Sequence, residues 1–215
     1  MISVAVIVAL VTCLSGLVFA NDGSPCDHSD AGGDKLIGVG DMGHNSLAPW
    51  HHIWDTEFII TNPNCESELE IRWVSLIRSD ESVIFAGPPS ELDLPDVLSG
   101  HQTIQLSIAE IVAEVCDSSQ VDVMVNSEAD KYTVEIIWTK AYYSSYSRYY
   151  SRSYDRSDIH PLTGWQKEKV WYEAGDNVGM AISEAEMKLF TGGGRFSEPE
   201  ACRWCPPTPP AEPEP

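Results

Sequence analysis

Residues 54–60 read Trp-Asp-Thr-Glu-Phe-Ile-Ile, and residues 69–77 read Leu-Glu-Ile-Arg-Trp-Val-Ser-Leu-Ile. In both stretches large apolar residues alternate with polar ones, which is the period of two expected of a strand with one buried face. The tripeptide Asn62-Pro63-Asn64 between them supplies a turn. The two stretches therefore predict neighbouring strands of a sheet.

Working outward from this pair, strand-like runs recur along the chain at 82–86, 101–106, 121–125, 132–139 and 169–173. The runs at 121–125 and 132–139 are expected to form a hairpin. Capping boxes formed by Ser107 with Glu110 and by Ser183 with Glu186 predict a helix over 108–115 and a second short helix ending at glycines 192–194. Strands at this spacing predict an all-β fold, an antiparallel β-sandwich of immunoglobulin-like general architecture with one or two short helices.

The first 20 residues contain no charged side chain and end in Val18-Phe19-Ala20, a small-residue pattern of the kind that precedes signal cleavage. We expect residues 1–20 to be a secretory signal peptide, so that the mature protein is secreted or periplasmic and has no membrane span. Since about 20 apolar residues can also cross a bilayer, an uncleaved anchor is the alternative.

Composition divides the rest of the chain into three regions. Residues 21–48 are rich in Gly and Asp with little periodicity, which predicts an extended N-terminal arm. Residues 49–200 hold the strands and form the sandwich domain, with a Tyr/Ser/Arg-rich insertion at 141–156. Residues 201–215 hold a Cys-x-x-Cys motif and a proline-rich tail of polyproline character.

The overall charge limits the choice of partners. The chain has 215 residues, and its 33 acidic and 13 basic side chains give a formal charge of -20. Such a charge repels the phosphates of nucleic acids, so no nucleic-acid partner is expected. A hydrophobic content of 43% is ordinary for a globular domain.

Export permits disulfides, and the mature chain would keep Cys26, Cys65, Cys116, Cys202 and Cys205. An odd number of cysteines leaves one thiol free or intermolecular, and the connectivity stays open. For the Cys202-x-x-Cys205 motif we expect a local staple or a bridge to Cys26. A redox pair or a zinc site is disfavoured, because the motif lacks a thioredoxin-like context and a second ligand pair.

Residues 38–43 have the G-x-G-x-x-G spacing of dinucleotide-binding loops. The βαβ context that this motif needs is missing, so a glycine-rich turn is predicted and no cofactor is expected. His51, His52 and Asp55 are candidate metal ligands. Because adjacent strand residues point to opposite faces, only one of the two histidines can aim at a given ion, and no metal site is expected.

The insertion at 141–156 divides into the tetrads AYYS, SYSR, YYSR and SYDR, with Tyr in the second place of each. If the strand that begins at Tyr132 continues, Tyr and Arg alternate along one face, where rings and guanidinium groups can stack. Tyr, Ser and Arg are also residues that recognition loops favour. The candidate contact residues are Tyr142, Tyr146, Arg148, Tyr150, Arg152, Tyr154 and Arg156.

These features favour a non-enzymatic binding or assembly module of the cell envelope or surface. Its partner would be another protein, its own copies or a glycan, contacted through the Tyr/Arg strip. Two alternatives remain open. One is a secreted metal-dependent hydrolase using His51, His52, His101, His160 and nearby carboxylates, and the other is a structural spacer whose proline tail crosses a cell wall.

Overall fold

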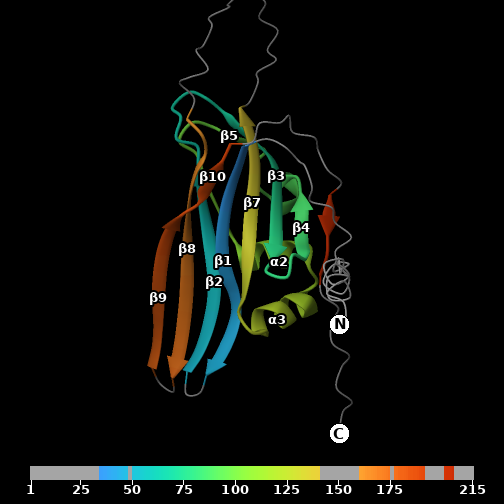
Figure 1. Cartoon of the computed structure of the whole chain (residues 1–215), viewed down its shortest axis with the longest axis vertical. Helices are drawn as coiled ribbons and strands as arrows, with labels where there is room; N and C mark the ends of the chain where they lie inside the picture. The colour runs from blue at the N-terminus through green and yellow to red at the C-terminus, as the bar shows by residue number, and fades with distance from the viewer. Residues whose placement is uncertain (1–33, 48–49, 141–159, 175–176, 192–200, 206–215) are drawn as a thin grey trace, which may run out of the picture.

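The computed structural model describes residues 34–47, 50–140, 160–174, 177–191 and 201–205 (Figure 1). The predicted signal peptide, the Tyr/Ser/Arg-rich insertion and the proline-rich tail therefore lie outside the described residues. The strands are β1 (Asp34–Leu47), β2 (Trp50–Thr61), β3 (Leu69–Arg78), β4 (Val83–Gly87), β5 (Val97–Leu98), β6 (Thr103–Ser107), β7 (Asp130–Lys140), β8 (Thr163–Ala174), β9 (Asn177–Glu186), β10 (Lys188–Phe190) and β11 (Cys202–Arg203). The helices are α2 (Ile108–Val115) and α3 (Ser118–Asn126), with a 3-10 turn η1 (Pro89–Leu92). The predicted all-β, antiparallel sandwich with short helices is confirmed.

The strands form one continuous ladder that folds into two layers. Its order is β11-β4-β3-β7-β1-β2-β8-β9, with β10 on β1, β5 on β3 and β6 on β2. The first part of β1, residues 34–42, pairs with β7, and the second part, residues 43–47, pairs with β2. Strand β1 therefore passes from one layer to the other and belongs to both, as its central place in Figure 1 shows.

Three glycines allow this passage. A Cβ atom on Gly38 would lie 2.5 Å from the ring of Phe58, and one on Gly40 would lie 2.3 Å from Cβ of Thr56. Gly43 has a φ of 134°, a conformation that other residues rarely adopt. Strand β1 thus crosses over β2 at a distance that only glycine permits.

At the crossing, the buried hydroxyl of one β2 residue takes the place of a backbone partner for β1. Thr56 is fully buried, and its Oγ1 accepts a hydrogen bond from Asp41 N at 2.9 Å and donates one to Asp41 O at 3.2 Å. The prediction of an arm over 21–48 is therefore wrong for residues 34–47, and that of a turn over 38–43 is also wrong. Both stretches lie in a central strand, which the composition concealed because glycines occupy positions where apolar residues would alternate.

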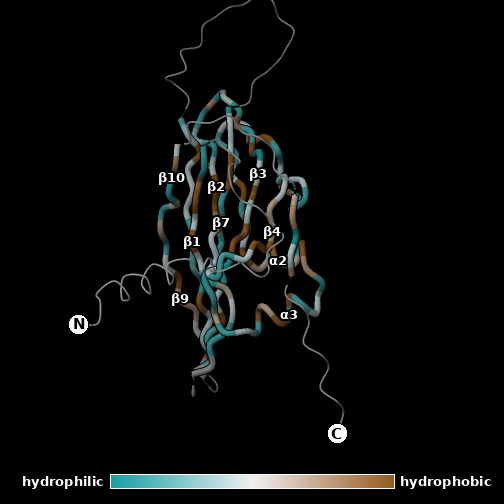
Figure 2. The backbone as a smooth tube through the Cα atoms, turned by 45° about the vertical axis from the view of Figure 1, so that its right-hand side comes forward, coloured by the Kyte–Doolittle hydropathy of each residue, from teal (hydrophilic) through white to brown (hydrophobic). Residues whose placement is uncertain are grey.

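Helix α2 closes the space between the layers. Ser107 Oγ accepts from Glu110 N at 3.1 Å, and the Glu110 carboxylate accepts from Ser107 N at 2.7 Å, which confirms the predicted capping box. The buried face of the helix, formed by Ile108, Ile111 and Val112, contacts β1, β2, β4 and β6. Figure 2 colours hydrophobic residues brown, and brown segments lie around α2. Within the described ranges, neither α2 nor α3 is long and apolar enough to cross a membrane.

A disulfide fixes the C-terminal segment to this helix. Cys116 follows α2 and is bonded to Cys205, with an S–S distance of 1.97 Å. Cys202 is also disulfide-bonded, whereas Cys65 is free and exposed. The predicted local staple between Cys202 and Cys205 is therefore wrong, because β11 runs extended along β4 and brings Cys205 to α2.

Two segments adopt the opposite secondary structure from the one predicted. Residues 121–125, predicted as a strand, lie in α3, which begins where Gln120 Oε1 accepts from Asp117 N at 3.0 Å. This local cap outweighs the strand preference of the valines, so the predicted hairpin with 132–139 does not form. Residues 183–190, predicted as a helix, end β9 and form β10, because pairing with β8 and β1 outweighs the local capping signal.

The Thr56 hydroxyl provides a test of the crossing. Thr56→Val keeps the shape of the side chain but leaves Asp41 N without its acceptor, so we expect the free energy of unfolding to fall by about 1–3 kcal/mol. Thr61→Val is the matched control, because the bond from Thr61 to Thr103 is exposed. Chemical denaturation of both variants measures the difference, and equal losses would contradict this role of Thr56.

Candidate functional site

Strand β9 is the outermost strand of its layer and pairs with β8 alone among the described strands. Three exposed apolar side chains alternate along it: Val178 is 72% exposed, Met180 51% and Ile182 52%. An exposed edge offers unpaired backbone N–H and C=O groups, which are a template for another strand. We call residues 177–186 the β9 edge.

The apolar side chains of β9 continue across the sheet as a row. Met180 is the cross-strand neighbour of Trp171 in β8, and Trp171 is that of Ile53 in β2. Directly paired residues lie on one face, so these three side chains form a single apolar row on the outer face. Ile53 is 39% exposed, so the row stays accessible at its inner end as well.

Charged rows border this apolar row on one side. Lys169 Nζ lies 3.1 Å from Glu57 Oε2, and Lys167 Nζ lies 3.5 Å from Glu184 Oε1. These ion pairs join neighbouring strands and neutralise each other locally. The outer face is therefore apolar near Met180. On the C-terminal side of Ile182 it is polar, with positive and negative charges in pairs.

The histidines predicted as metal ligands are separated by the sheet. His51 stacks on His44 with ring centroids 5.6 Å apart, whereas His52 lies edge-on to Trp54 at 6.5 Å. As adjacent residues of β2, His51 and His52 point to opposite faces, as predicted. In the part of the chain that the structure describes, no group of three or more His, Cys, Asp or Glu could hold a metal ion.

Asp55, the third predicted ligand, faces the start of α2. Its Oδ1 accepts from Ala109 N at 3.3 Å. Burial raises the pKa of Asp55 although that backbone bond, the Ser107 hydroxyl and nearby Lys169 all favour the charged form. Asp55 thus serves the N-terminus of the helix, where a carboxylate is stabilised by the orphan N–H groups.

A thiol and an imidazole meet at the opposite end of β2. His101 Nε2 lies 3.2 Å from Cys65 Sγ, and His101 N donates to Asn62 O at 3.0 Å and to Asn64 O at 2.9 Å. A Cβ atom on Gly100 would lie 2.1 Å from Cys65 O, so only glycine fits beside this peptide. The imidazole is therefore held against the thiol at hydrogen-bond distance.

Two buried asparagines fix this corner. Asn62 Nδ2 donates to Leu98 O at 2.8 Å, and Asn64 exchanges hydrogen bonds with the backbone of His160 at 2.8 and 2.9 Å. His101 and His160 thus gather beyond Thr61, whereas His51 lies about 33 Å away at the start of β2. The four histidines proposed for a hydrolase do not converge on one cleft.

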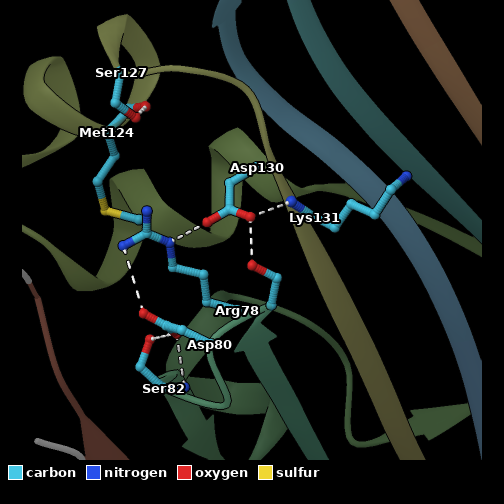
Figure 3. A network of polar contacts seen from close by, with 8 residues as sticks. Arg78, Asp80, Ser82, Met124, Ser127, Asp130 and Lys131 are labelled. Atoms are coloured by element: carbon cyan, nitrogen blue, oxygen red, sulfur yellow. Dashed lines mark hydrogen bonds and ion pairs between the residues drawn. The ribbon is translucent and has the colours of Figure 1, made fainter.

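A third polar cluster joins the turn after β3 to the start of β7 (Figure 3). Arg78 Nε donates to Asp130 Oδ2 at 2.5 Å, and Ser79 Oγ donates to Asp130 Oδ1. Burial acts to raise the pKa of Asp130, but the bonds from Ser79, Arg78 and Lys131 N outweigh it and lower that pKa. Both carboxylate oxygens of Asp130 thus have donors within the cluster, so this is a structural clamp.

The same cluster affects two neighbouring groups. The pKa of Asp80 is lowered, since bonds from the Ser82 hydroxyl and N–H and the charge of Arg78 outweigh burial. Burial raises the pKa of Tyr132 to about 12, although Arg78 opposes the shift. Both shifts reflect packing of the turn against β7.

The predicted contact residues of the Tyr/Arg strip lie outside the described residues. The β9 edge was missed in the sequence, although Val178, Met180 and Ile182 alternate there with Gly179, Ala181 and Ser183. The alternation with a period of two indicates a strand, whereas the pair of Ser183 with Glu186 predicts a helix cap at the same place. Only the pairing with β8 shows that this alternation belongs to a strand.

The comparisons with known proteins add no relative. No family model matches the chain, and no curated protein is similar to it. The candidate sites therefore stand on the geometry of this chain alone.

Acid should weaken the clamp around Asp130. Because its folded pKa is lowered from an ordinary value of 3.8, its stabilising contribution is present above about pH 4 and is lost as the pH falls through the folded pKa. Asp130→Asn should lower the free energy of unfolding by about 1–2 kcal/mol at pH 7. Denaturation from pH 7 to 2 measures this, and the deficit should shrink in acid.

Glu81→Gln, an exposed change in the same turn, is the control for this measurement. A pH dependence of the Asp130→Asn deficit no different from that of Glu81→Gln would contradict the assignment.

Thiol labelling tests the corner at Cys65. In the native, unreduced protein we expect an alkylating reagent to modify Cys65 but not Cys116, Cys202 or Cys205, since those three are disulfide-bonded. His101→Gln should slow labelling of Cys65 by about threefold to tenfold at pH 7, because it removes the ring nitrogen that lies against the thiol sulfur. Peptide mass analysis measures both, and unchanged kinetics would show that the imidazole has no influence on the thiol.

Proposed function

We propose that this chain is an exported, non-enzymatic binding or assembly module of the cell envelope or surface. The observation that carries the proposal is the β9 edge, which pairs on one side only among the described strands and whose apolar side chains are exposed. Soluble proteins usually protect such edges with Lys, Pro, bulges or covering elements. An edge left open in this way favours strand addition by a protein partner.

The rest of the described surface is consistent with a stable scaffold for that edge. The inward-facing side chains of the strands and of α2 are buried in one core, the Cys116–Cys205 disulfide attaches the C-terminal segment to α2, and both carboxylate oxygens of Asp130 accept hydrogen bonds. The disulfide also fits an oxidising compartment, in keeping with the predicted signal peptide. Rigid scaffolds of this kind commonly present a binding element at their margin.

The Tyr/Arg strip remains a second predicted contact element of the same module. Its residues lie outside the described structure, so its contribution stands on composition alone. We expect it to add contact area and positive charge, through which the module would contact an acidic protein surface or a glycan.

Binding of the purified mature chain to envelopes of the producing cells tests this function. Labelled protein should bind saturably, and Ile182→Lys should weaken binding at least about tenfold, because a charge on the β9 edge opposes strand addition. Deletion of residues 142–156 tests the Tyr/Arg strip in the same assay and should reduce binding without shifting the unfolding transition.

Val97→Lys is the matched control, because Val97 is an exposed valine in β5, 37% accessible and outside the β9 edge. It should bind like the unmodified chain. Absence of saturable binding would overturn the proposed function, and saturable binding that survives both Ile182→Lys and the deletion would overturn the assignment of the β9 edge and the Tyr/Arg strip as its contact elements.

A further inference from the structure

We propose that the β9 edge pairs with the β9 edge of a second copy of this chain, antiparallel and about a two-fold axis at Met180. The inference rests on the proposed function, because it names the partner of the same edge. Pairing of this kind would join the outer layers of the two copies into one continuous sheet.

The backbone groups at the open side of β9 belong to its even-numbered residues. In an antiparallel ladder both polar groups of one residue face the same neighbour, and successive residues alternate between neighbours. Met187 N donates to Gly164 O at 2.9 Å, one step beyond the pair of Trp165 with Glu186. Odd-numbered residues therefore face β8, and Val178, Met180 and Ile182 present their N–H and C=O groups to the open side.

A two-fold axis at Met180 matches these groups. Met180 then opposes its own counterpart, and Val178 opposes Ile182 of the second copy. In this register the even-numbered residues form the hydrogen-bonded pairs, and the odd-numbered residues form the non-hydrogen-bonded pairs between them, as an antiparallel ladder requires. The apolar row of Ile53, Trp171 and Met180 would continue without a break into the same row of the second copy.

The distribution of charge selects this register. Residues 177–183 contain no Asp, Glu, Lys, Arg or Pro, although the chain as a whole carries a charge of -20. An axis at Met180 pairs this uncharged run entirely with itself, and the pairing ends there, because the next pair in register would set Glu184 against Asp176, two like charges. Moving the axis toward the C-terminus, to Ala181, would place Glu184 opposite Val178 and so oppose a carboxylate with an apolar side chain. The uncharged run is thus self-complementary, which is the condition for a symmetric interface.

The size of the edge sets the expected strength. Seven paired residues per copy, 177–183, with three exposed apolar side chains lie at the small end of specific interfaces, about 1,200 Å² in total. We therefore expect a reversible dimer that forms at micromolar rather than nanomolar concentration. Its sedimentation coefficient should rise with protein concentration.

Disulfide trapping in the mature chain tests the register. Cys65→Ser removes the free thiol, and Met180→Cys is added to that background. Opposed residues of a hydrogen-bonded antiparallel pair have Cα atoms about 5.5 Å apart, which suits a disulfide. A small organic disulfide as oxidant should then yield a covalent dimer on a non-reducing gel, with thiolate exchange releasing the small thiols.

Val178→Cys in the same background is the matched control. With the axis at Met180 its counterpart lies four residues along the strand, about 13 Å away, so its dimer yield should be at least about tenfold lower. A mixture of Val178→Cys with Ile182→Cys should restore the covalent dimer, because these positions oppose each other. Equal yields from Met180→Cys and Val178→Cys would overturn the register.

Sedimentation of the unmodified chain separates this inference from the proposed function. A monomer at every concentration up to the millimolar range, with envelope binding that Ile182→Lys still weakens, would overturn the second copy as partner and leave the proposed function standing. A concentration-dependent dimer that Ile182→Lys disrupts, with no binding to envelopes, would support self-pairing and overturn envelope binding.

Discussion

The structure depends on the passage of β1 from one layer of the sandwich to the other. At the crossing, Gly38 and Gly40 bring the backbone of β1 against Phe58 and Thr56 of β2. A side chain at either glycine would push β1 away from β2. Without a hydrogen-bond acceptor, the partly buried Asp41 N would lower the free energy of unfolding. The Thr56 hydroxyl meets this requirement from within the core. The remaining strands connect to β1 either directly or through intervening strands of the same sheet.

The crossing also explains why the β9 edge is open. Because the end of β1 pairs with β2, the outer layer grows through β2 and β8 and ends at β9, far from α2 and the disulfide. No described element lies beyond β9, and both of its faces are largely solvent-exposed. The fold thus places its most deeply buried residues around α2 and β7 and the open β9 edge at the margin of the sheet.

The polar clusters lie at separate places and have separate roles. Asp55 accepts a hydrogen bond at the N-terminus of α2, and Asp130 holds the turn after β3. Cys65 and His101 form an exposed thiol–imidazole pair at the far end of β2. Residues that share a chemistry in the sequence, such as His51 and His101, are kept apart by the length of a strand. Conversely, Cys65 and His101 meet because Gly100 packs against the Cys65 peptide. Such proximity cannot be inferred from spacing along the chain.

The sequence by itself determined the elements whose local signals agree with their packing. Alternation specified β2 and β3, and the Ser107 and Glu110 box specified α2, because each signal is local. Only the tertiary structure decided the fate of β1 and β9, whereas α3 follows from a local cap that competes with the alternation of its valines. Glycine conceals the alternation of β1, a cap at Asp117 overrides the strand preference of its valines, and pairing with β8 overrides the cap at Ser183. Long-range pairing also chose Cys116 as the partner of Cys205, since a disulfide requires proximity in space, which cysteine spacing does not encode.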